Sequence, residues 1–82
     1  MNELRDTIDL MTSDDYKDRF QAEYYQTKIR YNRLHQILVK YEAGTLGFEP
    51  ACPIDILKNQ QKQMGMYLYC LEVRAQIENI KL

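Results

Sequence analysis

The sequence is poor in the residues that cross-link or interrupt a small protein. Its 82 residues include two cysteines, two prolines, three glycines, one histidine and no tryptophan. Cys52 and Cys70 are too few for a disulfide scaffold and indicate reduced, intracellular thiols. With His35 they do not supply the usual ligands of a structural zinc site. We therefore expect no metal and no cofactor, and of the usual ways to stabilise a small chain only self-association remains.

Long hydrophobic runs are also missing. No apolar stretch approaches the ~18 residues that a membrane-spanning helix needs. The first eleven residues carry Glu3, Asp6 and Asp9, which is the wrong chemistry for a secretory signal. We expect one domain over residues 1–82 that does not enter a membrane and works in the cytoplasm. A chain of this length buries only about 60% of the surface that its unfolded form exposes, so its core is thin.

The near-neutral net charge of −1 conceals two segments of opposite sign. Residues 1–18 carry six acidic side chains against two basic ones, whereas residues 19–41 carry five basic side chains against Glu23 alone. The acidic segment suits the start of a helix, where negative charge is favoured. The basic segment is either the solvated face of that helix or an attractive surface for an anionic ligand.

Apolar periodicity predicts an all-α fold. A short helix is expected over residues 2–11, a long helix over 14–43, a loop over 44–52 and a second long helix over 53–80. Asp14 and Asp15 are placed in the first turn of the long helix, after a cap at Thr12 or Ser13. The two long helices are expected to form an antiparallel hairpin, since a short loop joins them. The first long helix carries a heptad seam formed by Phe20, Tyr24, Thr27, Tyr31, Leu34, Leu38 and Tyr41.

The second long helix has two apolar stripes on nearly opposite faces. The inner stripe consists of Leu57, Met64, Leu68, Leu71 and Ala75. The outer stripe, which we predict as the oligomer interface, consists of Met66, Cys70, Val73, Ile77 and Ile80. One partner helix can cover only one stripe, and large bare apolar patches are uncommon on soluble monomers. The second cover is either the segment 2–11 or another copy of the chain, and a homo-oligomer is favoured.

Little in the sequence suggests catalysis. His35 has no carboxylate three or four residues away to orient it, and Cys52 has no evident base. No glycine-rich phosphate loop or metal-ligand cluster is present. We therefore expect a protein that is not an enzyme.

Binding is better supported, because polar side chains flank the helix seams. Arginine offers paired donors for phosphate, and tyrosine offers a stacking face with a hydroxyl group. The same side chains also suit ion pairs and wet interfaces, so a purely structural role stays open. The candidate ligand-binding residues are Arg19, Glu23, Lys28, Gln60, Tyr67 and Arg74. With a net charge of −1, strong binding of duplex nucleic acid is not expected.

The second long helix follows the pattern L-x-x-Q-x-x-x-M-x-x-Y-x-x-x-L-x-x-R from Leu57 to Arg74. With Tyr16-x-x-Arg19-x-x-x-Glu23 and Lys28-Ile29 before it, the chain resembles small helical-hairpin proteins of tailed phages and prophages, one from a crAss-like phage. The resemblance covers about residues 14–78. Two features depart from the family pattern: Gln61 stands where an apolar residue is usual, and the connector is longer and richer in glycine.

The resemblance implies an accessory phage protein in the cytoplasm of an infected bacterium. The architecture is also similar to phage anti-defence proteins that act as oligomers and sequester nucleotide immune signals between subunits. Our leading hypothesis is therefore a non-catalytic counter-defence protein that binds a cyclic nucleotide or an ADP-ribose-type signal. The alternatives are an anti-CRISPR or another protein-binding inhibitor of a host defence effector, and a structural phage accessory protein.

Overall fold

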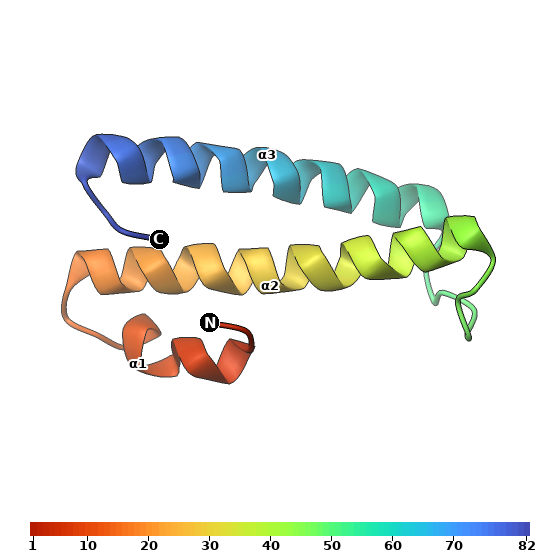
Figure 1. The fold of residues 1–82 in the computed structure, drawn as a ribbon, viewed down its shortest axis with the longest axis horizontal. Coiled ribbons are helices and arrows are strands. Elements are labelled where there is room, and N and C mark those ends of the chain that lie inside the picture. The colour runs from red at the N-terminus through yellow and green to blue at the C-terminus, as the bar shows by residue number, and fades with distance from the viewer.

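The computed structural model describes residues 1–82 as an antiparallel pair of long helices with a short helical segment along one of them (Figure 1). The elements are a 3₁₀ turn η1 (Leu4–Thr7), α1 (Ile8–Met11), α2 (Tyr16–Ala43) and α3 (Ile54–Glu78). The molecule measures 43 × 24 × 17 Å. This confirms the predicted all-α hairpin. No helix combines the length and the apolar character that crossing a membrane requires.

Helix α2 starts two residues later than predicted. Asp15 is the N-cap, because its carboxylate accepts a 2.9 Å hydrogen bond from the amide of Lys17. The predicted cap, Ser13, instead accepts from the amide of Asp15 through its hydroxyl. At the other end Gly44 takes the left-handed conformation with φ of 75°, which suits glycine at a helix C-terminus.

Helix α3 ends before the predicted limit, and this changes the role of Ile80. Asn79 adopts the left-handed conformation with φ of 57°, a backbone state that asparagine tolerates better than most residues. The chain then folds back, and the amide of Ile80 donates to the carbonyl of Ala75 at 2.9 Å. Ile80 is only 6% exposed and packs in the core. Its assignment to the oligomer interface is therefore wrong for this chain.

The segment at the N-terminus packs on α2 and reaches no part of α3. Thr7 is buried and accepts a hydrogen bond from Gln26 on α2, and Leu4 and Leu10 are half-buried beside it. Leu4 and Thr7 share a face because η1 is a 3₁₀ turn, in which residues three apart are aligned; Leu10, in α1, lies three residues further on. In a regular α-helix over residues 2–11, Leu4, Ile8 and Met11 would share one apolar face, but Ile8 and Met11 are exposed here. This segment consequently does not cover the outer stripe of α3.

The hydrophobic core lies near the end of the hairpin where α2 begins and α3 ends. The predicted inner stripe of α3 does face α2: Leu68, Leu71 and Ala75 are buried, and Leu57 and Met64 are half-buried. In the connector, the apolar side chain of Phe48 does not cover the other end of the hairpin, since it is 58% exposed. The core cluster comprises Phe20, Tyr24, Leu68, Leu71, Ala75 and Ile80.

Candidate functional site

Arg74, a predicted ligand residue, lies in a cluster of interacting side chains on one edge of the hairpin. Its guanidinium is 4.8 Å from the ring centroid of Phe20, and its Nε donates to Glu78 at 3.1 Å. It also donates to the hydroxyl of Tyr16, which in turn donates to Glu78 at 2.9 Å. The hydrogen bond with Glu78 raises the pKa of Arg74, and the hydrogen bond from Tyr16 lowers the pKa of Glu78. These contacts tie the start of α2 to the end of α3.

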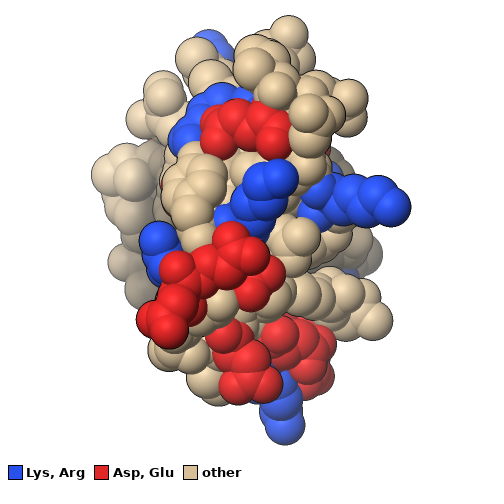
Figure 2. Space-filling view, turned by 90° about the vertical axis from the view of Figure 1, so that its left-hand side faces the viewer, with Lys and Arg blue, Asp and Glu red and all other residues tan.

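The charges at this end of the molecule are mixed. Figure 2 views that end directly and shows acidic side chains interleaved with lysine and arginine. Arg19 donates to the carbonyl of Ser13 at 2.8 Å and forms no ion pair with Glu23. Its guanidinium therefore holds the segment that precedes α2. This surface is not a field of one sign that would attract an anion.

The six predicted ligand residues do not meet in one pocket. At 100° per residue, Arg19 and Glu23 lie on the same hairpin edge as Arg74. Gln60 and Tyr67 are exposed on that edge too, but lie about 21 Å and 10 Å from Arg74 along α3. Lys28 lies on the opposite edge.

The opposite edge contains a groove between the long helices, which we call the lateral groove. Its middle part is a cavity of about 470 Å³, within the range of small-molecule sites. The aromatic side chains of Tyr31 from α2 and Tyr69 from α3 contribute to its lining. The complete lining is Tyr31, Gln61, Lys62, Gly65, Met66, Tyr69 and Cys70.

Gly65 brings Tyr31 close to α3. A Cβ atom at this position would lie 3.4 Å from Cε2 of Tyr31, so the ring rests on the helix where a side chain would otherwise stand. Lys28 lies 5.9 Å from the centroid of the same ring, on its α2 side. The middle cavity thus combines an aromatic surface with the ammonium group of Lys62, and Lys28 lies beside it against the ring of Tyr31.

On the connector side of the middle cavity, a contact between side chains of α2 and α3 divides the groove. Gln61 Nε2 lies 2.6 Å from His35 Nδ1, and the imidazole is nearly parallel to Tyr31, at 9° with 6.3 Å between centroids. Beyond this contact lies a second cavity, which includes His35, Val39, Lys58 and Gln61 in its lining. Gln61 was noted in the sequence only as a departure from the family pattern, and its contact with His35 gives it a structural role.

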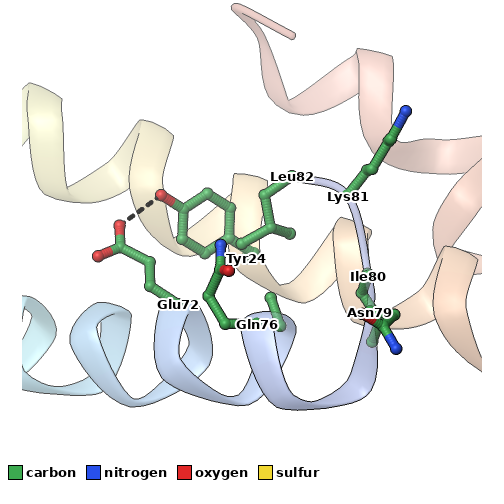
Figure 3. Close-up of a pocket in the computed structure, with 8 residues that line it drawn as sticks. Tyr24, Glu72, Gln76, Asn79, Ile80, Lys81 and Leu82 are labelled. Carbon is green, nitrogen blue, oxygen red and sulfur yellow. Dashed lines mark hydrogen bonds between the residues drawn. The ribbon is translucent and has the colours of Figure 1, made fainter.

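A third cavity, the tail cavity, lies on the same edge beneath the end of the chain (Figure 3). It has a volume of about 710 Å³. Tyr24 enters it from α2, and Glu72 and Gln76 enter it from α3. The Tyr24 hydroxyl donates to Glu72 Oε2 at 2.7 Å. Burial and this hydrogen bond raise the pKa of Tyr24 to about 12, so the phenol stays protonated.

The sequence marked Lys28 as a candidate ligand residue but not its neighbours on this edge. Tyr24 and Tyr31 were assigned to the helix seam, and both do flank or form the core. Their polar ends nonetheless reach the groove edge, which heptad counting does not show. The available signal was Gly65, because a glycine inside a long helix often marks a close approach of another group.

Alanine in place of Gly65 is expected to stabilise the fold and narrow the groove. Alanine is favoured over glycine in a helix by about 1 kcal/mol, which for a chain of this size raises Tm by roughly 4–8 °C. The new methyl group meets Tyr31 at 3.4 Å, an ordinary contact distance. Thermal unfolding measures the gain. A fall in Tm would show that the ring cannot accept the methyl group.

The outer stripe of α3 is uncovered in the single chain, apart from Ile80. Ile77 is 75% exposed, and Met66, Cys70 and Val73 are exposed as well. Met66 and Cys70 also line the lateral groove, so the stripe and the groove share a rim. No group of three or more His, Cys, Asp or Glu side chains is arranged to hold a metal ion.

Comparison with known proteins places this helical pair in a family. The family model described as Sequestin matches residues 14–77, which span both long helices and their connector. No curated protein and no solved structure matches the chain. The family's name indicates a sequestering protein, which agrees with the predicted function at that coarser level. The match covers well over half of the sequence, and the chain therefore belongs to the Sequestin family.

Proposed function

We propose that this protein sequesters a nucleotide-type signal in the lateral groove and returns it chemically unchanged. The observation that carries the proposal is the middle cavity, where Tyr31 and Tyr69 contribute aromatic surface and Lys62 an ammonium group. Lys28 adds a second cation beside Tyr31. A base or a ribose can pack on the tyrosine rings while a phosphate meets the lysines. Membership of the Sequestin family supports the sequestering role.

The signal would be a cyclic nucleotide or an ADP-ribose-type molecule, bound during phage counter-defence in the cytoplasm of an infected bacterium. Binding without turnover is consistent with the side chains on the groove. His35, the one imidazole, is engaged by Gln61, and no carboxylate hydrogen-bonds to it. Tight, reversible binding alone would lower the free concentration of the signal that a host effector needs.

The partner proposed for the outer stripe is a second copy of the chain. The exposed members Met66, Cys70, Val73 and Ile77 are spaced by four, three and four residues, the spacing of a helix–helix seam. Because Met66 and Cys70 belong to both surfaces, a copy docked on the stripe would stand beside the open groove. Binding and self-association would then support each other.

Calorimetric titration with cyclic ADP-ribose, ADP-ribose and cyclic dinucleotides tests the proposal. At least one should bind, and heating the complex should release it intact, as judged by chromatography. Lys28→Ala should weaken binding about 10–100-fold, the usual effect of losing a charge-assisted hydrogen bond of 1.5–3 kcal/mol.

Lys40→Ala is the matched control, since Lys40 is an exposed lysine near the other end of α2. Its affinity should equal that of the unmodified protein. If no nucleotide binds, the proposal is wrong, and capture of a host nuclease would favour the protein-binding inhibitor. If Lys28→Ala binds as tightly as the control, the ligand does not use this groove.

A further inference from the structure

We infer that the tail cavity is a base subsite, in which Glu72 and Gln76 recognise the amino edge of a 6-aminopurine. The inference rests on the proposed function and adds a chemical class and specificity-determining residues to it. The cavity is separate from the tyrosine-lined middle of the groove but lies on the same hairpin edge. It draws its polar side chains from both long helices (Figure 3).

The walls of the cavity are fixed by contacts within the chain. Gln21 donates to the carbonyl of Lys81 at 2.8 Å and holds the tail against α2. The buried side chain of Ile80 anchors the same tail in the core. Tyr24 is only 8% exposed and reaches Glu72 across the two helices. The Glu72 carboxylate therefore stands at a defined position before any ligand arrives, whereas Gln76 is exposed and can orient its amide toward an occupant.

Glu72 has one carboxylate oxygen that meets no donor from the chain. Its Oε2 accepts from the protonated hydroxyl of Tyr24, whereas Oε1 has no partner within the chain. Glu72 is exposed, so water can donate to this oxygen in the free protein. An ionised carboxylate only accepts hydrogen bonds, so an occupant that displaces the water must bring an N–H or O–H group. Gln76, one turn further along α3, offers both an amide donor and a carbonyl acceptor.

This pair of side chains matches the edge of a 6-aminopurine. The exocyclic amino group can donate to Glu72, while a ring nitrogen beside it accepts from the Gln76 amide. A 6-oxopurine presents a carbonyl oxygen at the same place. That oxygen would face the Glu72 carboxylate without a proton between them. Both oxygens are acceptors, so they would repel each other and neither would gain a hydrogen bond.

The position of Lys28 agrees with a nucleotide in this orientation. Lys28 follows Tyr24 by one helical turn, about 6 Å along α2. A base in the tail cavity would therefore direct its ribose and phosphates along the groove toward Lys28. The aromatic middle part of the groove, at Tyr31, comes directly after it.

Titration with ADP-ribose and with its hypoxanthine counterpart, inosine diphosphate ribose, tests this assignment. The two probes differ at the position that Glu72 and Gln76 would read. The unmodified protein should bind ADP-ribose about 10–100-fold more tightly, as expected for one hydrogen bond to a charged group. Glu72→Gln keeps an acceptor for Tyr24, so the fold should persist while the preference falls below about threefold.

Glu49→Gln provides a control, since this exposed connector residue lies outside the tail cavity. It should preserve the full preference for ADP-ribose. Equal binding of both probes by the unmodified protein, or an unchanged preference in Glu72→Gln, would overturn the base subsite and leave sequestration standing. If neither probe binds but a guanine cyclic dinucleotide does, the base assignment is likewise wrong. If no nucleotide binds at all, the proposed function fails along with it.

Discussion

Replacement of Leu71 by alanine is expected to destabilise this protein more than any substitution on its surface. Leu71 is 1% exposed and belongs to the core cluster between α2 and α3, together with Phe20 and Tyr24. Truncating a buried leucine costs about 2–5 kcal/mol, because apolar contacts are lost and a cavity remains. For a chain of this size we expect Tm to fall by roughly 10–25 °C.

The expected loss of stability is large because the core consists of few residues. Only ten of the 82 residues are buried, and six of them form the cluster that contains Leu71. Thermal and urea unfolding at a fixed protein concentration measure the loss. Ile56→Ala is the matched control on the same helix, since Ile56 is 56% exposed and lies outside the outer stripe. A Tm for Leu71→Ala within 3 °C of the unmodified protein would contradict the described core.

The helical pair could be predicted because its signals are local and repeated. The inner stripe of α3 recurs over five turns, and Leu68, Leu71 and Ala75 all face α2 as the spacing requires. Helix α2 ends at Ala43, the predicted limit, and Gly44 follows it in the left-handed conformation. Asn79 was missed as a helix end, because asparagine takes that conformation less often than glycine. Because Asn79 ends α3, the chain turns back and Ile80 lies in the core, not on the outer stripe.

The candidate site was harder to predict, because it depends on contacts between positions distant in sequence. Tyr24 and Glu72 are 48 residues apart, and His35 and Gln61 are 26 apart. No single-helix pattern pairs these residues. Arg74 shows the same limit: the sequence marked it as a candidate ligand residue but could not show that its guanidinium contacts Phe20, Tyr16 and Glu78.

Ile77→Lys is expected to abolish self-association if a second copy docks on the outer stripe. In a symmetric dimer each substitution occurs twice, and each removes the burial of an isoleucine worth about 1.5–3 kcal/mol. The dissociation constant should therefore rise at least about 100-fold. Ile77 lies outside the core and outside every groove lining, so neither the fold nor the ligand contacts of one chain should change directly.

Sedimentation over a range of concentrations gives the mass, and titration with the ligand found for the groove gives the affinity. Ile56→Lys is the matched control, because it adds the same charge to an exposed isoleucine on α3, about 30 Å from Ile77 along the helix. The control should keep the mass and the affinity of the unmodified protein. Because Met66 and Cys70 join the stripe to the groove, loss of the second copy in Ile77→Lys should also weaken ligand binding. A monomeric unmodified protein would refute the interface, whereas a monomeric Ile77→Lys with full affinity would show that the groove is complete within one chain.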